Sequence, residues 1–334
     1  MDLQNTYTVC VRCTTFNHHT YIEDAMNGFC MQKTTFPFVC IIIDDLSTDG
    51  EQEVLKKYFQ EHFNLLENEE TNDYVLNFGI HKTNANCYFS IFYLKYNHFS
   101  IRKSKVPYYL RWQNSSKYVA ICEGDDYWID ENKLQKQVDF LENNKDYSMV
   151  FHRAEIVYES PIETSLQCTD IESREYSADE LFDKWIVPTA SILARREIYN
   201  IKSKDRYRPL NGDIIYVLNC AKIGKLRGLS EKMSAYRVQA NGVTYDVNLM
   251  KSRMLRYPEH FKYIKDNYPF LNQRLVNKKL GIAYGGAVYY DEGIVRKLRD
   301  FILACYYSPI LILKPFEKLV DIFTQKKKCQ KNCA

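Results

Sequence analysis

The sequence lacks the glycine-rich loops with which many nucleotide-binding proteins hold phosphate groups. No GxGxxG or GxxxxGK[ST] pattern occurs in its 334 residues, so the dinucleotide-binding and Walker-type classes are without their main element. The formal net charge is only +3, which is too small to indicate a nucleic-acid partner. The seven histidines form no group with metal-ligand spacing. A negatively charged ligand would therefore have to be held in another way.

Long apolar runs and a secretion signal are also missing. The longest apolar stretch near the C-terminus, Phe301 to Leu313, is interrupted by Pro309 and is shorter than the roughly 20 residues that a membrane-spanning helix needs. Residues 1–7 contain neither a basic n-region nor an apolar h-region, so no signal peptide is expected. These features predict a cytoplasmic protein.

The cysteines do not form the pattern of a disulfide framework. There are eleven, an odd number at irregular spacings, and several lie in apolar, strand-like runs, as expected for buried free thiols in a reducing compartment. Cys10 and Cys13 imitate a CxxC metal pair. Positions three apart on a strand point to opposite faces, so these two thiols are not expected to share an ion.

Alternating strand-like and helix-like segments open the chain. Tyr7 to Cys13 reads as a strand, and Thr20 with Glu23 forms a capping-box pattern before a helical run. Phe38 to Ile43 is a continuous apolar run, typical of a strand buried on both faces. A further helical pattern contains Val54 to Phe59. This order predicts an α/β fold with a doubly wound, mixed and mostly parallel sheet.

The rest of the chain is less regular. Residues 61–105 are predicted as mixed loop and short helix, because polar and aromatic stretches alternate there. After about residue 245 the pattern changes to basic, Tyr-rich helical segments ending in a basic tail at 326–331. We therefore expect a catalytic domain over 1–245 and a helical extension over 246–334. Between these segments the expected elements are strands at 118–122, 149–158 and 191–194, a helix after Asp130, a capping box of Ser177 and Glu180, and a helix from Asp213 to Ile223 that stops at Gly224.

Three polar sites follow predicted strands: Thr14 to Asn17, Asp44-Asp45, and Glu123 to Asp126. In an open α/β sheet, ligands bind at the carboxyl ends of the strands. Carboxylates repel phosphate unless a divalent cation lies between them, so acids at this edge suggest Mg²⁺ or Mn²⁺ bridging a pyrophosphate. Each site alone also fits a simpler role, since Thr, Asn and Asp form turns and cap helices. Their shared position after buried strands favours the functional interpretation.

These residues match the sequence motifs of a known family. The chain resembles glycosyltransferase family 2, which has the GT-A fold, and within it a bacterial surface-polysaccharide type. The resemblance covers roughly residues 6–245. The matching segments are the opening strand and turn, Asp44-Asp45-Leu46-Ser47-Thr48-Asp49-Gly50, Cys122-Glu123-Gly124-Asp125-Asp126-Tyr127-Trp128, Lys133-Leu134-Gln135-Lys136-Gln137, Gly212-Asp213, Gly224-Lys225, Tyr236-Arg237-Val238 and Gly242-Val243.

The resemblance implies a role for each site residue. The donor nucleotide would be held by Thr14, Thr15, Asn17, Asp45, Glu123 and Asp125. The metal, Mn²⁺ or Mg²⁺, would be bound at a DxD-type site, with Asp125 and Asp126 both open as ligands. Gln239 stands where the family has a histidine near the metal and diphosphate; an amide oxygen can also bind a hard cation, but the site would be weaker or differently tuned.

Asp213 lies where the family has its catalytic base. The base would accept the proton of the acceptor hydroxyl during backside attack, which inverts the anomeric centre. The simpler alternative for Asp213 is a helix N-cap after Asn211-Gly212. Arg237 would contact the diphosphate or, alternatively, a local carboxylate.

Other residues have weaker signals. A basic group in the stretch holding Asn97, His98 and Lys105 could contact the pyrophosphate, with a solvated loop as the alternative. Trp128 and Trp185 could stack on a sugar, but aromatic residues beside apolar runs more often belong to the core.

The sequence thus predicts an inverting, metal-dependent, hexosyl-type glycosyltransferase. Its expected donor is a nucleotide sugar, with UDP-sugars first, and its expected acceptor is a glycan or lipid-linked glycan in cell-surface polysaccharide synthesis. A sugar nucleotidyltransferase is one alternative, although residues 14–20 lack the Gly and Lys of a triphosphate loop. A non-catalytic protein that binds nucleotide or glycan is another. The stretch Phe301 to Phe323 with its basic tail suggests peripheral contact with the inner membrane; a helical cap with a disordered tail is the alternative.

Overall fold

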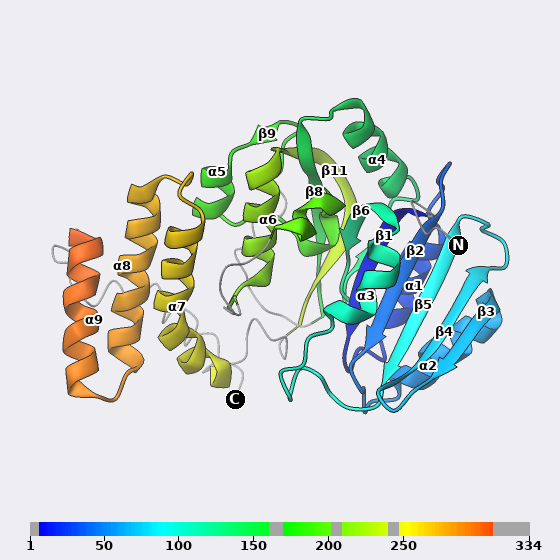
Figure 1. The fold of residues 1–334 in the computed structure, drawn as a ribbon, viewed down its shortest axis with the longest axis horizontal. Coiled ribbons are helices and arrows are strands. Elements are labelled where there is room, and N and C mark those ends of the chain that lie inside the picture. The colour runs from blue at the N-terminus through cyan, green and yellow to red at the C-terminus, as the bar shows by residue number, and fades with distance from the viewer. Residues whose placement is uncertain (1–6, 160–169, 202–208, 240–246, 310–334) are drawn as a thin grey trace.

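The protein is built around one large mixed β-sheet with helices on both faces and a row of three helices at one end (Figure 1). The computed structural model describes residues 7–159, 170–201, 209–239 and 247–309. Within these residues the sheet has eleven strands, in the order β3-β4-β5-β2-β1-β6-β10-β8-β11-β7, with β9 paired to β11. Strands β5, β2, β1 and β6 are mutually parallel at its centre.

Residues 7–62 contain strands and helices in the predicted order. They form β1 (Tyr7–Thr15), α1 (Ile22–Cys30), β2 (Phe38–Asp44) and α2 (Glu51–His62). All seven residues of β2 are buried, as expected for a strand covered on both faces of a parallel sheet.

The prediction of loop and short helix for residues 61–105 is wrong over most of its length. The structure has three strands there: β3 (Phe63–Glu70), β4 (Tyr74–His81) and β5 (Cys87–Leu94). Strands β3 and β4 form an antiparallel hairpin at the edge of the sheet, and β5 joins it to β2. Most of β3 is exposed, so polar residues dominate it and hide the strand from a search for apolar runs.

The elements between residues 106 and 238 complete the sheet and the helices that cover it. Its elements are α3 (Val106–Gln113), β6 (Ser116–Ile121), β7 (Tyr127–Trp128), α4 (Lys133–Asn143), β8 (Tyr147–Tyr158), β9 (Glu175–Tyr176), α5 (Ala178–Asp183), β10 (Leu193–Arg195), α6 (Gly212–Ile223) and β11 (Lys225–Val238), with short 3₁₀ turns at Thr189–Ser191 and Arg196–Asn200. The predicted doubly wound α/β architecture is confirmed.

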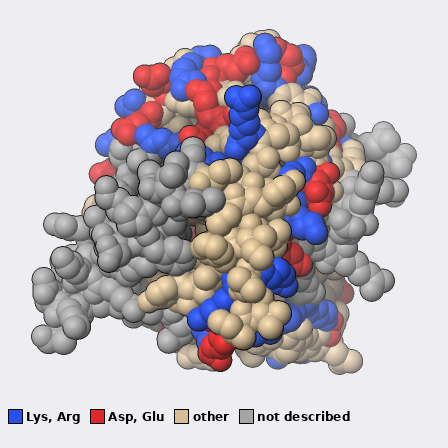
Figure 2. Space-filling model, turned by 90° about the vertical axis from the view of Figure 1, so that its left-hand side faces the viewer, with Lys and Arg blue, Asp and Glu red and all other residues tan. Residues whose placement is uncertain are grey.

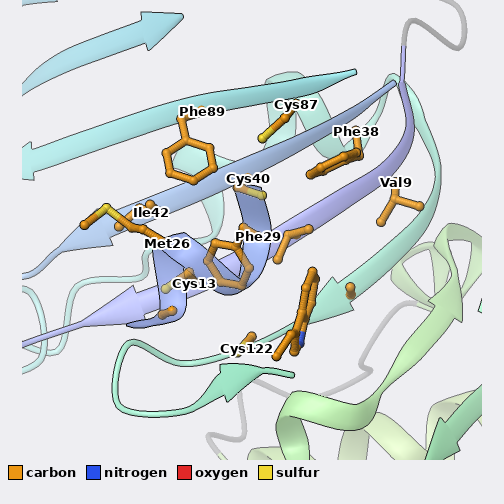
Figure 3. Packing of buried hydrophobic residues seen from close by; sticks show 14 of the residues in the cluster. Val9, Cys13, Met26, Phe29, Phe38, Cys40, Ile42, Cys87, Phe89 and Cys122 are labelled. Carbon is orange, nitrogen blue, oxygen red and sulfur yellow. The ribbon is translucent and has the colours of Figure 1, made fainter. Parts of the chain in front are cut away.

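Successive residues of the strands point to opposite faces of the sheet, and each face has its own hydrophobic core. Cys13 of β1 faces the core shared with α1, α2 and α4, where Met26 and Phe29 pack against the sheet (Figure 3). Cys10 faces the opposite core, shared with α3. The two thiols therefore lie on opposite faces, as predicted. Eight cysteines within the described residues are free; Cys168, Cys329 and Cys333 lie outside them.

Two predicted helix starts are wrong. Helix α1 begins at Ile22 after Tyr21, with no side-chain cap, so the predicted capping box at Thr20 does not form. The carbonyl of His18 accepts hydrogen bonds from the backbone N–H groups of Tyr21 and Ile22. Helix α4 begins after Asn132, also without a side-chain cap, and Asp130 accepts from the Asn132 N–H at 2.8 Å in the turn before it. In both places a tight turn satisfies the first N–H groups before the predicted cap can act.

Two other helix boundaries are confirmed. Ser177 and Glu180 form the predicted capping box at the start of α5. Helix α6 ends before Gly224.

The described residues after 246 form the helices α7 (Val247–Asn267), α8 (Gln273–Tyr290) and α9 (Ile294–Tyr307), and Figure 2 views the molecule from the end that these helices form. Ile264, Tyr268 and Val276 pack with Phe182 of α5 and Leu218 of α6, so α7 and α8 join the row of helices to the sheet domain. No helix within the described part of the chain is long and apolar enough to cross a membrane. The helical character predicted after residue 245 is confirmed for residues 247–307.

A charged side chain lies inside the main core. Lys133, at the start of α4, is fully buried. Its Nζ donates to Gln137 Oε1 at 2.8 Å and lies 4.1 Å from the centroid of the Trp128 ring. Burial lowers the pKa of Lys133 from 10.5 to about 7, because an ammonium group loses hydration that these contacts only partly replace.

We expect this lysine to make stability depend on pH. Between pH 7 and 10.5 the unfolded chain binds one more proton than the folded protein at this group, so the free energy of unfolding should rise with pH by up to about 1.4 kcal/mol per unit. The variant Lys133→Met should lose this slope, measured by urea unfolding at pH 7.5 and 9.5. The exposed control Lys57→Met should retain it, and equal slopes in all three proteins would contradict the expectation.

Candidate functional site

The three polar sites predicted at strand ends meet at one edge of the sheet. β1 lies between β2 and β6 and runs parallel to both. Backbone hydrogen bonds continue past the strands: the Asp45 N–H donates to the Thr15 carbonyl at 3.1 Å, and the Gly124 N–H donates to the Thr14 carbonyl at 3.1 Å. The turn after β1 is therefore held between the two acidic segments.

Glu51 links the first two turns. Its carboxylate accepts a short hydrogen bond from the Thr15 hydroxyl, one from the His18 N–H at 2.8 Å, and one from the Ser47 hydroxyl at 2.8 Å. Glu51 is fully buried. Sequence reasoning missed it; its only signal is an acid in the first turn of a helix, where acids are common for their effect on the helix dipole.

Asn17 and Thr14 each have a structural partner. Asn17 has a positive φ of 57°. Its side-chain oxygen accepts from the Thr48 N–H at 2.8 Å, and its own N–H donates to Ser47 Oγ at 2.9 Å. The Thr14 hydroxyl instead shares a 2.8 Å hydrogen bond with the hydroxyl of Tyr109. For Asn17 the turn-forming alternative describes the structure.

Asp44 and Asp45 are buried and point to different partners. Asp44 accepts from the Ser47 N–H at 3.3 Å and from Gln52, and burial raises its pKa to about 6. Asp45 forms a 2.7 Å ion pair with Lys105 and accepts from the His98 N–H at 2.7 Å. The Phe99 N–H donates to the same carboxylate at 3.0 Å.

Within the segment that holds Asn97, His98 and Lys105, these three residues contact Asp45, whereas residues 99–104 between them are exposed. The segment closes over Asp45, and the side-chain amide of Asn97 donates to the Asp45 carbonyl at 2.8 Å. Lys105 balances a buried acid rather than extending toward solvent. A nucleotide bound by Asp45 would have to share this carboxylate with the segment.

The acids after β6 point in different directions. Asp126 is buried and accepts from the Arg237 N–H at 2.9 Å. Asp125 lies with its Oδ2 at 3.5 Å from Gln239 Nε2 and 3.9 Å from His18 Nε2. Glu123 is exposed to solvent, but the protein around its carboxyl group removes part of its hydration. Desolvation, then repulsion from Asp125 and Asp213, raises the pKa of Glu123 to about 7.

This arrangement separates the two candidate metal ligands. Asp125 lies beside Gln239, whereas Asp126 faces the backbone of β11. Within the described residues, no group of three or more His, Cys, Asp and Glu side chains is placed to hold a metal ion. One carboxylate with an amide oxygen still suits Mg²⁺ or Mn²⁺, because such ions are often held by one or two carboxylates together with substrate phosphates.

Arg237 is bound by local carboxylates. Its Nε donates to Glu159 at 3.0 Å and its Nη2 forms a short contact with Asp24. Its Nη1 donates to the Asp125 carbonyl at 3.1 Å, and the guanidinium lies between the rings of Tyr21 and Tyr127. Of the two predicted partners, the structure therefore shows the local carboxylates. Glu159 and Asp24 had no signal in the sequence, because they lie far from Arg237 along the chain.

Asp213 lies in the first turn of α6 and is half-buried. It is not the N-cap, which is Asn211, so that alternative is wrong. Its Oδ1 accepts from the Ile214 N–H at 2.9 Å, and desolvation raises its pKa. The negative charge of Asp213 also contributes to the raised pKa of Glu123.

The two predicted sugar-stacking tryptophans differ in burial. Trp128 is buried in the main core and donates its indole N–H to the Ala190 carbonyl at 2.9 Å. Trp185 packs against the core that α5 and α6 share with β8. The core alternative describes Trp128, whereas Trp185 is only partly buried.

Comparison with known proteins gives relatives in sequence and in fold. No family model matches the chain. The uncharacterized protein Mb1547 of Mycobacterium bovis is 27% identical over 230 residues, covering 68% of this chain and 58% of that protein. The uncharacterized protein Rv1520 of Mycobacterium tuberculosis matches to the same extent. The chain thus spans less than two thirds of the length of these relatives.

Among solved structures, S. aureus TarS is similar in fold. Its fragment 1–349 has a TM-score of 0.51 at 13% identity, covering 89% of this chain and 80% of TarS 1–349. The same fragment in complex with UDP-GlcNAc also has a TM-score of 0.51, at 11% identity, covering 95% and 92%. At these identities the likeness concerns the fold, and it agrees with the predicted GT-A type.

Gly124 allows the turn after β1 to approach the acids. A Cβ on Gly124 would lie 2.3 Å from Thr15 Oγ1 and 2.6 Å from Thr15 Cβ. We expect Gly124→Ala to lower the free energy of unfolding by about 1–3 kcal/mol. The control Gly285→Ala in α8, where a Cβ meets nothing within 4 Å, should be neutral or stabilising. Urea unfolding measures both, and equal stability of the two variants would contradict the expected crowding.

Proposed function

We propose that the protein is a glycosyltransferase that takes a sugar from a nucleotide-diphosphate donor and depends on Mn²⁺ or Mg²⁺. The observation that carries the proposal is the position of Asp125, which lies with Gln239 and His18 at the edge where three parallel strands end. That edge is the ligand-binding position of open α/β sheets. The similar fold of TarS with bound UDP-GlcNAc supports it.

Asp125 and Gln239 are the residues that would hold the cation. The Gln239 amide nitrogen is the atom nearest the carboxylate, but the oxygen and nitrogen of an amide can exchange places by a flip of the side chain. A bound cation would neutralise the negative charge that develops on the leaving diphosphate. Asp126 would act indirectly, because its hydrogen bond to the Arg237 N–H fixes the backbone next to Gln239.

The donor nucleotide would be held by the turns around this site. We assign Thr14, Thr15, Asn17, Asp45 and Glu123 to this role, as the family resemblance implies. Thr15 and Asn17 are fixed through Glu51 and Ser47, so they would contact the nucleotide mainly through a rigid backbone. UDP-sugars are the first donors to test.

Asp213 would be the base. A carboxylate whose pKa is raised by desolvation is a better proton acceptor than one in water. It would take the proton from the acceptor hydroxyl while that oxygen attacks the anomeric carbon, and a single displacement inverts this centre. A glycan or lipid-linked glycan is the proposed acceptor, in the synthesis of cell-surface polysaccharide in the bacterial cytoplasm, with peripheral contact to the inner membrane.

A non-catalytic protein that binds nucleotide or glycan is the second candidate. Two observations favour it: Gln239 replaces the histidine that the family resemblance implies, and Lys105 pairs with Asp45. This candidate predicts nucleotide binding without turnover. A nucleotidyltransferase is less well supported, because residues 14–20 contain no glycine or lysine.

Asp125 and Asp126 should differ as metal ligands. We expect Asp125→Asn to weaken Mn²⁺ binding in the presence of UDP about tenfold or more. Asp126→Asn should weaken it less than about threefold, because an amide oxygen can still accept from the Arg237 N–H. Isothermal titration with Mn²⁺ measures both affinities. A stronger loss of Mn²⁺ affinity in the Asp126 variant would assign the role of metal ligand to Asp126 instead of Asp125.

Asp213 should affect turnover but not donor binding. Asp213→Asn should leave UDP affinity unchanged and reduce slow hydrolysis of the UDP-sugar, in which water replaces the acceptor, by about 10²–10⁴-fold. The exposed control Asp139→Asn should leave both unchanged. Hydrolysis at the wild-type rate in the Asp213 variant would exclude it as the base, and hydrolysis absent in the wild type would favour the non-catalytic candidate.

A further inference from the structure

His18, in the turn after β1, places a ring nitrogen near the carboxylate of Asp125. Its Nε2 lies 3.9 Å from Asp125 Oδ2, and the Gln239 amide nitrogen lies 3.5 Å from the same oxygen. The side chains of His18 and Asp125 are 21% and 30% exposed, so a small ion in solution can reach both. An imidazole, a carboxylate and an amide therefore meet at one oxygen atom.

Hydrogen bonding determines which ring nitrogen of His18 carries the proton. The Thr15 hydroxyl has one hydrogen, and it donates that hydrogen to the Glu51 carboxylate. The same hydroxyl oxygen lies 3.1 Å from His18 Nδ1. Because its hydrogen is already used, this oxygen accepts from Nδ1. Nδ1 is thus the protonated nitrogen of the neutral ring, and Nε2 keeps its lone pair on the side of Asp125.

Glu51 supports this assignment and fixes the position of His18. Its carboxylate accepts from the Ser47 hydroxyl at 2.8 Å and from the His18 N–H at 2.8 Å, in addition to the Thr15 hydroxyl. A carboxylate with three donors needs no proton of its own. The His18 carbonyl accepts from two backbone N–H groups of the following turn. The protein itself therefore holds both the backbone and the Nδ1 side of His18 in place.

We propose that His18 Nε2 is a ligand of the divalent cation, together with Asp125 and Gln239. The inference rests on the proposed function, because it adds a ligand to the cation assigned there. A histidine that binds a metal through one nitrogen donates its other N–H to an oxygen, which fixes the ring. The chain of Glu51, Thr15 and His18 has this form.

The distances between the three groups agree with a shared ion. Ligand atoms at about 2.1 Å from one octahedral ion lie between about 3.0 and 4.2 Å from one another. The separations of 3.5 and 3.9 Å fall within this range. The set contains only two side chains of the His, Cys, Asp and Glu types, since its third member is an amide. It is therefore compatible with the lack, among the described residues, of a metal-binding group of three such side chains.

An ion pair between His18 and Asp125 is the simpler alternative. A pair between partly exposed side chains at this distance contributes little by itself. The two interpretations differ in the choice of metal, because an imidazole nitrogen favours transition-metal ions, whereas Mg²⁺ prefers oxygen ligands. With His18 as a ligand, the site should bind Mn²⁺ more tightly than Mg²⁺.

The test is the electron spin echo spectrum of Mn²⁺ bound to the full chain in the presence of UDP. Only the histidines would be labelled with ¹⁵N, so that a coordinated imidazole is distinguished from the Gln239 amide and from the nucleotide. We expect ¹⁵N modulation in the wild type and none in His18→Gln. The control His19→Gln changes the exposed neighbouring histidine and should retain the modulation.

Isothermal titration of the same proteins gives a second measurement. His18→Gln should weaken Mn²⁺ binding about tenfold or more. It should weaken Mg²⁺ binding less than about threefold, because the new amide oxygen suits Mg²⁺. Thermal unfolding without metal checks that the variant is folded.

Three results would overturn the proposal. Bound Mn²⁺ without ¹⁵N modulation in the wild type would leave Asp125 and Gln239 as the protein ligands, and the proposed transferase would stand. Equal Mn²⁺ affinity of His18→Gln and the wild type would have the same meaning. A wild-type protein that binds no Mn²⁺, with or without UDP, would instead contradict the metal dependence in the proposed function, and the role of His18 with it.

Discussion

Repulsion between carboxylates is the constraint on which the candidate site depends. Parallel strands bring Asp44, Asp45, Glu51, Asp125 and Asp126 to one edge of the sheet, and most of these groups are buried. This cluster of acids is stable because nearly every carboxylate has its own hydrogen-bond donors. Glu51 accepts from two hydroxyls and a backbone N–H. Asp45 pairs with Lys105 and accepts from two backbone N–H groups. Asp125 differs, since the contacts of its carboxylate are longer, at 3.5 and 3.9 Å. A cation would complete this partly balanced position, and the acids that are already satisfied would hold its surroundings rigid.

The sequence was informative where structure is local. The order of strands and helices over the first sixty residues, the capping box of Ser177 and the placement of Cys10 and Cys13 on opposite faces all follow from periodicity and short-range hydrogen bonding. The β3-β4 hairpin was missed because an exposed edge strand lacks an apolar pattern. The starts of α1 and α4 were misplaced because turns formed by His18 and Asp130 satisfy the helix ends first.

The partners of the site residues could not be predicted in the same way. The strand ends that meet were identified correctly, because parallel strands carry their carboxyl ends to one edge. The pairs Arg237–Asp24 and Lys105–Asp45 join residues far apart in the chain, and no local pattern marks them. Asp125 could not be separated from Asp126 by spacing, because the direction of each side chain depends on β11. The assigned roles in donor binding, metal binding and catalysis stay predictions.

Thermal stabilisation by nucleotides tests the central claim most directly. The wild-type protein would be heated with UDP, GDP, CMP or dTDP, each with and without Mn²⁺, because a ligand that binds only the folded state raises its melting temperature. We expect one nucleoside diphosphate, UDP first among them, to raise the melting temperature, and Mn²⁺ to increase the shift. A shift independent of Mn²⁺ would contradict the role given to Asp125 and Gln239. No shift with any nucleotide would contradict the donor site itself.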